Sequence, residues 1–289
     1  MAILSLDQLS GYIWINGEFV QWQEAKIHAL THSLHYSGAV FEGERAYNGK
    51  IFKLEEHTKR LIESARTVMM EVPYEFDDII KIHHEVIAKN NIDDAYIRPL
   101  IWRGSESLNL TNKILSINML IAAVPSSSKE ATSVNLLLSR WKKPHPDSMP
   151  PQCKSAGHYG MMIVAQQEAK AAGFDDALIL DWRNYIAECT TTNIFFVQKD
   201  KLITPIADTF LNGITRRTVI ELAHKLGLKV DEKHLTLETL NKYDECFMTG
   251  TAAEIKSVAS IDLWDKKIIF KENRITSLLQ EEYKALVRS

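Results

Sequence analysis

The residues whose types and spacing most clearly suit a chemical role lie between Asp176 and Arg217. A single carboxylate, Glu188, follows a strand-like segment there and precedes a run of small hydroxyl residues, and Gly213 opens an amphipathic helix. A carboxylate at a strand end can hold a positively charged ring nitrogen, and the unsatisfied N–H groups of a helix N-terminus bind phosphate. The pattern therefore suits a flat, cationic, phosphorylated cofactor.

Four residues elsewhere could act on such a cofactor or its substrate, and each also has a plain structural explanation. Lys154 stands just ahead of a predicted helix, where most lysines are solvated. Arg60 lies beside the apolar stripe of another predicted helix, so it could equally be a surface arginine with a buried stem. Tyr96 and Arg98 fall on one face of a predicted strand, where they could receive a carboxylate or form an ion pair at a rim.

Histidines and cysteines form no pattern that predicts a metal site. His32 and His35 could share a helix face, but no third ligand with suitable spacing follows them. Cys153, Cys189 and Cys246 are far apart and lack metal-ligand spacing. We therefore expect no metal, and so few cysteines suit a reducing cytosol.

The size and charge of the chain favour small-molecule partners. Its 289 residues, 45% of them hydrophobic, are enough for two domains with a core each. The 34 basic and 37 acidic residues give a formal charge of −3 without a Lys/Arg block, so nucleic-acid binding is not expected. The start lacks a signal-peptide pattern and no apolar run reaches membrane length, so we expect a soluble, cytoplasmic protein with no membrane partner.

A polar segment divides the chain. The nearly all-apolar stretch 115–124 is followed at once by P-S-S-S-K-E-A-T-S, which is typical of a linker. We therefore predict a smaller N-terminal α/β domain at 1–125, a linker at 126–133 and a larger C-terminal domain at 134–289.

Turn residues and periodicity predict the main elements. Asn16-Gly17 and Asn48-Gly49 indicate β-hairpins, and the prolines within 141–152 indicate an extended, stiff loop. The helix predicted at 55–71 has an apolar stripe made of Leu61, Ile62, Ala65, Val68 and Met69. Other helices are predicted at 77–89, 214–227, 238–243 and 274–287 and around Met162, and strands at 95–102, 115–124, 134–138, 194–197 and 246–249.

Several motifs resemble one family. The segments E-C-T-T-T-N-I-F, L-I-T and L-N-G-I-T-R, with these gaps, resemble the signature of the class-IV aminotransferases, which are pyridoxal 5'-phosphate (PLP) enzymes of fold type IV. The segments Y-I-W-I-N-G, H-Y-S-G-A-V-F-E-G, A-Y-I-R-P-L-I and F-M-T-G-T-A-A-E look like those of branched-chain amino-acid aminotransferases. The resemblance runs from about Gly11 to about Ile261.

The resemblance implies a fold, a reaction and an assembly. The implied fold is α/β (α+β), a two-domain fold like that of D-amino-acid aminotransferase with PLP between the domains. The implied reaction moves an amino group between leucine, isoleucine or valine and 2-oxoglutarate or glutamate, with 2-oxo acids as products. Family members are homo-oligomers, so the resemblance implies a dimer or a hexamer built from dimers.

The resemblance also implies the roles of individual residues. Lys154 would be the catalytic residue, which forms a Schiff base with PLP, and Glu188 would hold the pyridine nitrogen. Ala156 and His158 depart from the commoner K-x-G-G-N-Y pattern, which leaves the Schiff base in place but affects the local hydrogen bonding. The implied cofactor-binding residues are Arg60, Lys154, Tyr159, Glu188, Asn193, Gly213, Ile214, Thr215, Gly250 and Thr251. The implied substrate-binding residues are Tyr36, Phe41, Gly43, Tyr96, Arg98, Trp141, Thr251 and Ala252.

Other functions stay open. A D-amino-acid aminotransferase or an aminodeoxychorismate lyase would share the same fold. A protein that only sequesters PLP would need no substrate residues such as Tyr96 and Arg98. A purely structural two-domain protein would bind no coloured cofactor.

Overall fold

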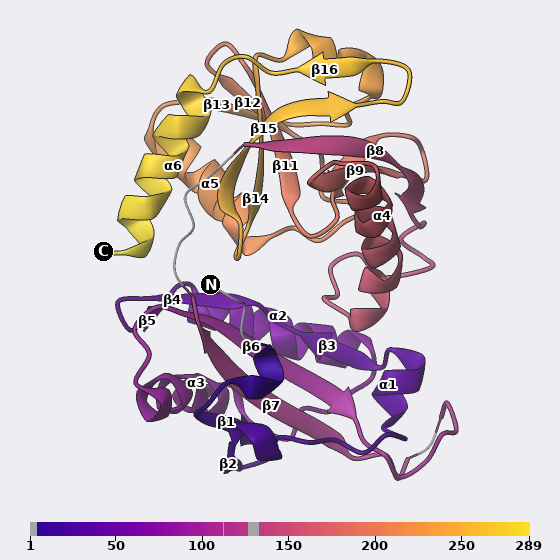
Figure 1. Ribbon diagram of the computed structural model, residues 1–289, viewed down its shortest axis with the longest axis vertical. Coiled ribbons are helices and arrows are strands. Elements are labelled where there is room, and N and C mark those ends of the chain that lie inside the picture. The colour runs from indigo at the N-terminus through magenta and orange to yellow at the C-terminus, as the bar shows by residue number, and fades with distance from the viewer. Residues whose placement is uncertain (1–4, 112, 127–132) are drawn as a thin grey trace. The chain divides into compact units, whose positions relative to one another are not determined.

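The computed structural model describes residues 5–111, 113–126 and 133–289. The described residues form two compact units (Figure 1): those within Met1–Ser128 and Cys153–Gly157, and those within Lys129–Gln152 and His158–Ser289. Of the predicted linker at 126–133, residues 127–132 lie outside the described residues. Each unit combines helices with a sheet, which agrees with the predicted α/β class.

An antiparallel sheet is the centre of the first unit. In its described part the sheet has seven strands, in the order β2-β1-β7-β6-β4-β5, with β3 beside β6. Both predicted hairpins are confirmed, because Asn16, Gly17, Asn48 and Gly49 have the positive φ angles (49°, 99°, 50° and 76°) that tight hairpin turns require. The strands are β1 (Tyr12–Ile15), β2 (Glu18–Gln21), β3 (Ala39–Phe41), β4 (Glu44–Tyr47), β5 (Lys50–Ile51), β6 (Ala95–Arg103) and β7 (Ile117–Pro125).

Amphipathic helices pack their apolar sides against this sheet. The fully buried Leu61 and Ile79 join the same core cluster as Ile97 of β6. The helix predicted at 55–71 ends early, and the placement of Met69 in its apolar stripe is wrong. Met69 has a φ of 58° and is 85% exposed, since the left-handed backbone there turns the chain out of the helix. The helices are α1 (His32–Tyr36), which was not predicted, α2 (Leu54–Thr67) and α3 (Phe76–Asn90), with 3-10 turns η1 (Leu6–Gln8) and η2 (Trp22–Glu24).

The second unit is built on a mixed sheet. In its described part this sheet has nine strands, in the order β10-β9-β8-β15-β14-β11-β12-β13, with β16 beside β15. Strand β8 lies parallel to both neighbours, β9 and β15. The strands are β8 (Val134–Lys143), β9 (Asp176–Asp181), β10 (Ile186–Cys189), β11 (Asn193–Gln198), β12 (Lys201–Thr204), β13 (Lys229–Glu232), β14 (Glu245–Gly250), β15 (Glu254–Asp262) and β16 (Lys267–Ile269).

Helix α4 packs against β8 and β9, and helices α5 and α6 pack against β14 (Figure 1). One of them, α4, buries Met162 and Ala165 with Leu137 and Ile179 of β8 and β9. The predicted closing helix at 274–287 is confirmed, and the predicted helix at 238–243 is a 3-10 segment. The helices are α4 (Tyr159–Ala171), α5 (Ile214–Lys225) and α6 (Arg274–Val287), with η3 (Ala156–His158) and η4 (Leu237–Lys242).

The bounds of one predicted strand in the second unit need correction. The strand predicted at 134–138 continues to Lys143, so the first residues of the predicted stiff loop at 141–152 are strand residues. Pairing with β9 resumes beyond an irregularity, at Lys142 opposite Leu180, and these ladder bonds keep the chain extended. Glu188 is the next-to-last residue of β10, which agrees with its predicted place at a strand end.

Candidate active site

In the first unit, Lys154 is fixed by its backbone. Its N–H donates to Ser64 Oγ of α2 at 3.0 Å, and its carbonyl accepts the N–H of Phe41 at 3.2 Å. A further bridge joins Val40 and Ser155, so residues 154 and 155 extend the edge of β3. The half-buried side chain places Nζ 5.0 Å from the centre of the Phe41 ring.

The surroundings of Lys154 favour its neutral form. Burial lowers the pKa of Lys154 to about 8, and the positive charges of Arg60 and Arg98 act in the same direction. The negative charge of Glu42 opposes this shift without cancelling it. An ordinary lysine has a pKa near 10.4, so Lys154 is an amine with a large neutral, nucleophilic fraction near pH 8.

Arg60 is held by a buried carboxylate. Arg60 donates from Nε to Glu42 Oε1 at 2.5 Å and from Nη2 to Glu42 Oε2 at 2.8 Å. His57 Nδ1 also lies 2.8 Å from Glu42 Oε2, and Glu42 is fully buried. Burial alone would raise the pKa of Glu42, but the adjacent Arg60 and His57 hold it well below its usual range. The two-point contact fixes the plane of the guanidinium, a group suited to phosphate.

Tyr96 and Arg98 share a face of β6, as predicted. Arg98 Nη2 donates to the Tyr96 hydroxyl at 2.7 Å, and its guanidinium carbon lies 4.7 Å from the centre of the Phe41 ring. Gly43 permits this arrangement, because a Cβ there would lie 2.3 Å from Tyr96 Oη. A cation, a phenol and an apolar ring thus meet beside Lys154.

Tyr36 is placed differently from these residues. It ends α1, is 46% exposed, and its ring lies 4.8 Å from that of His32. Its ring also lies 6.3 Å from that of His35.

In the second unit, Glu188 is a buried carboxylate with a partner on each oxygen. Lys143 Nζ lies 2.9 Å from Oε1, and Asn193 Nδ2 donates to Oε2 at 3.3 Å. Glu188 is 8% and Lys143 is 5% exposed. Both partners favour the ionised carboxylate, which is the form that can hold a protonated ring nitrogen.

Asn193 links Glu188 to the start of α5. Its Oδ1 accepts the N–H of Gly213 at 3.1 Å, and its Nδ2 also donates to Leu211 O at 3.0 Å. A Cβ on Gly213 would lie 2.3 Å from Asn193 Oδ1, so glycine is needed for this approach. The amide of Asn193 is thus used within the protein, while Ile214 and Thr215 supply first-turn N–H groups, which have no acceptor within a helix.

The remaining predicted residues of the second unit lie at strand ends and at a helix start. Gly250 ends β14, where a Cβ would lie 3.0 Å from Thr192 Cγ2. Thr251 and Ala252 form the turn into β15, and Ala252 is exposed. Tyr159 begins α4 and is partly buried, whereas Trp141 in β8 is 46% exposed.

Two functional candidates were missed in the sequence. Glu42 follows the apolar residues Val40 and Phe41, and an acidic residue in such a run signals a buried cation partner. Lys143 stands beside Lys142 and ahead of a proline-rich segment, so nothing local distinguished it.

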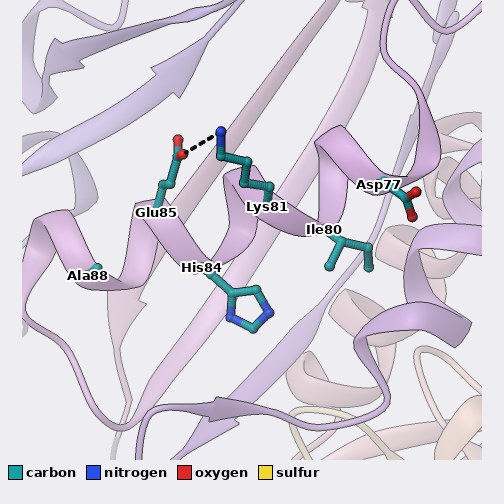
Figure 2. Close-up of a pocket in the computed structure, with 6 residues that line it drawn as sticks. All are labelled: Asp77, Ile80, Lys81, His84, Glu85 and Ala88. Carbon is teal, nitrogen blue, oxygen red and sulfur yellow. Dashed lines mark ion pairs between the residues drawn. The ribbon is translucent and has the colours of Figure 1, made fainter.

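Other features of the described residues do not add to this site. A pocket on the exposed face of α3 is lined by α3 side chains, with Lys81 and Glu85 3.7 Å apart (Figure 2), and none of the predicted site residues lines it. Within the described ranges, no group of three or more potential ligands could hold a metal ion, and no helix is long and apolar enough to cross a membrane.

Comparisons with known proteins show which family the chain belongs to. Residues 39–261 match the family described as Amino-transferase class IV. A probable branched-chain-amino-acid aminotransferase of Rickettsia conorii is 58% identical over 289 residues, all of both chains. The branched-chain aminotransferase of Thermoproteus uzoniensis with norvaline superposes with a TM-score of 0.91 at 35% identity, covering 96% of this chain and 95% of that one. The branched-chain amino acid aminotransferase of Thermobaculum terrenum in its PLP form gives 0.87 at 32%, covering 97% and 95%.

Proposed function

Because the chain belongs to the class IV aminotransferases and, among them, to the branched-chain-amino-acid aminotransferases, we propose that it moves the amino group between L-leucine, L-isoleucine or L-valine and 2-oxoglutarate. The observation that carries this proposal is the setting of Lys154. Its amine has a pKa lowered to about 8 and lies beside Phe41, near the cationic groups of Arg60 and Arg98.

We propose PLP as the cofactor, and the chemistry of the residues fits it. Glu188 is buried with a cationic partner, as an acid that must stay ionised against a ring nitrogen would be. Arg60, held on two sides by Glu42, suits a phosphate dianion, as do the N–H groups of Ile214 and Thr215. When bound, PLP supplies an electron sink for the pair released at the α-carbon of the amino acid.

The protein's own part centres on proton movement. The neutral amine of Lys154 accepts the proton from the α-carbon of the amino acid and passes it to the cofactor. In the second half of the reaction it carries a proton the other way, to the α-carbon of the second substrate. The lowered pKa of Lys154 supports both directions, because the amine changes protonation state near physiological pH. Tyr159 is proposed to contact the cofactor from the start of α4.

The substrate residues must accept two unlike side chains. Phe41 offers an apolar ring for a branched side chain, whose burial stabilises the complex by about 1 to 3 kcal/mol. We propose that Arg98 and Tyr96 receive the distal carboxylate of glutamate, with Gly43 keeping Tyr96 in place and Thr251-Ala252 serving the α-carboxylate. The Arg98–Tyr96 hydrogen bond of 2.7 Å supports a joint role.

An amino-donor assay tests the proposal. Purified protein with PLP should convert L-leucine and 2-oxoglutarate to glutamate, measured by a coupled glutamate assay, and L-leucine should bleach its yellow visible band. The Lys154→Ala variant should lose the transfer and serves as the control. Transfer from D-alanine with none from L-leucine would instead favour a D-amino-acid aminotransferase, and a yellow protein without transfer would favour simple PLP sequestration.

A further inference from the structure

The carboxylate of Glu188 depends on a lysine that the proposed reaction does not yet use. Lys143 ends β8 and Glu188 lies in β10, and these two strands flank β9. Lys143 Nζ and Glu188 Oε1 are 2.9 Å apart, with side chains only 6% and 10% exposed. A lysine so enclosed is held in one position rather than mobile at the surface.

We propose that Lys143 is a positioning residue of the cofactor site, whose ammonium keeps the Glu188 carboxylate ionised and aimed at the ring nitrogen. This inference rests on the proposed function, because it assigns Glu188 to that nitrogen. The inference goes beyond the proposed function because it names a residue that need not touch the cofactor.

The charge balance at Glu188 supports this role. Of the two partners described above, Asn193 is neutral and Lys143 carries a positive charge 2.9 Å from the carboxylate. A buried carboxylate that loses its cation takes up a proton more readily, because burial disfavours the charged form. A protonated Glu188 could no longer hold a protonated ring nitrogen.

The shape of the contact supports it as well. The ammonium of Lys143 meets one oxygen, which leaves the second to Asn193 and hence to the start of α5. Lysine acts as a point charge, whereas an arginine fork can engage both oxygens of a carboxylate. The two partners together fix the carboxylate plane.

The charge of Lys143 also acts on a second neighbour. Burial lowers the pKa of His158 to about 4, and the positive charge of Lys143 adds to that effect. His158 comes just before α4, at the position where the sequence departs from its family pattern. The ammonium therefore lies close to the start of α4 and leaves His158 neutral near pH 7.

The test compares PLP affinity in Lys143→Met, Lys143→Arg and the matched control Lys142→Met. Lys142 is the preceding residue of the same strand, but it is exposed and donates to Asn184. Apo-protein is titrated with PLP and followed by visible absorbance at several pH values, with thermal melting of the apo-protein as a second readout. We expect Lys143→Met to weaken PLP binding by about tenfold to a hundredfold, as when a residue that orients a ligand-holding side chain is lost. The loss should shrink as pH rises, since Glu188 then ionises again, while Lys142→Met stays close to wild type. Lys143→Arg keeps the charge but not the one-oxygen contact, so it should lose less affinity than Lys143→Met and show little dependence on pH.

A double replacement keeps the test informative if Lys143→Met does not fold. Glu188→Gln removes the buried negative charge, so adding Lys143→Met to it should cause little further loss of PLP affinity. An affinity of Lys143→Met equal to wild type, or a loss that is the same at every pH, would overturn the proposal. So would a full additional loss in the double variant. Wild type that binds PLP but transfers no amino group would refute the proposed function alone, and wild type that binds no PLP would refute both.

Discussion

Each unit contains a buried ion pair that supports a proposed cofactor-binding group, with the charges reversed between the two units. In the first, the buried anion Glu42 supports the cation Arg60. In the second, the buried cation Lys143 supports the anion Glu188. In both, the group proposed to face the cofactor has an oppositely charged partner whose own side chain is almost wholly enclosed.

The Glu42–Arg60 and Lys143–Glu188 pairs differ in the number of contacts that fix the supporting group. Glu42 receives two bonds from Arg60 and a third contact from His57, and it is fully buried. Lys143 contacts Oε1 of Glu188 with a single amine, and the neutral amide of Asn193 donates to Oε2. A phosphate-binding group gains from a rigid plane, whereas an acid that holds a ring nitrogen needs mainly its charge. We therefore expect the first pair to dominate stability and the second to dominate cofactor affinity.

Replacing Glu42 by Gln should have the largest effect on stability. The change leaves Arg60 without its buried counter-charge, which costs on the order of 3 to 5 kcal/mol. Chemical denaturation followed by circular dichroism measures the loss. The control is Glu55→Gln in α2, whose pair with Lys59 is exposed and should contribute only about 0 to 1 kcal/mol. Equal losses for both variants would remove the contrast between the units.

The Glu42–Arg60 pair should also make the stability of the protein depend on pH in acid. The pKa of Glu42 is lower in the folded chain than the value of about 4.3 for an unfolded one. Its contribution to the free energy of unfolding is thus present above about pH 4.3 and is lost as the pH falls toward the folded value. The melting temperature of wild type should fall more steeply with acid than that of Glu42→Gln, and parallel curves would contradict this.

Lys154 and Lys143 have opposite electrostatic surroundings. Lys154 lies near Arg60 and Arg98, which helps to lower its pKa to about 8, whereas Lys143 is paired with a carboxylate. The rate at which apo-protein reacts with PLP at Lys154, followed by absorbance, should rise about tenfold per pH unit below pH 8 and level off above it. Lys154→Arg should show no such reaction. A rate that keeps rising through pH 10 would mean an ordinary lysine.

Replacing Arg98 by Ala should separate the two substrates. Arg98 is proposed to bind the distal carboxylate of glutamate, and a hydrogen bond to a charged group is worth about 1.5 to 3 kcal/mol. We expect kcat/KM to fall about tenfold or more for glutamate and little for leucine. Tyr96→Phe, which removes only the hydroxyl bonded to Arg98, should give a smaller loss in the same direction. Equal losses for both substrates would remove Arg98 from this role.

The sequence predicted best what local chemistry determines. Asn16-Gly17 and Asn48-Gly49 indicated their hairpins because few other residues adopt positive φ, and the helix at 274–287 followed from its periodicity. Tyr96 and Arg98 were placed on one face by the two-residue repeat alone. The predictions that failed depend on distant partners. Strand β8, which carries Lys143, continues beyond its apolar residues because β9 continues to pair with it. Lys143 and Glu188 are 45 positions apart, and no sequence pattern links them.

Close approaches at two glycines give the finest test of the comparison. A Cβ on Gly43 would lie 2.3 Å from Tyr96 Oη, and one on Gly213 would lie 2.3 Å from Asn193 Oδ1. Neither glycine has a positive φ, so alanine acts through contact and not through backbone strain. Such overpacking costs about 1 to 3 kcal/mol when neighbours must shift.

The two alanine variants should therefore differ in what they damage. Gly43→Ala displaces Tyr96 and should lower kcat/KM for glutamate by a few-fold, with PLP affinity unchanged. Gly213→Ala displaces Asn193, which holds Glu188, and should weaken PLP binding. At limiting PLP it should therefore lower the rates with leucine and with glutamate alike. Adding Tyr96→Phe to Gly43→Ala removes the closest atom and should recover part of the folded stability, although the next ring atom would still be 3.1 Å from the new Cβ. If both variants changed PLP affinity equally, the separate roles of Tyr96 and Asn193 would be wrong, because Tyr96 would then support the cofactor as directly as Asn193 does.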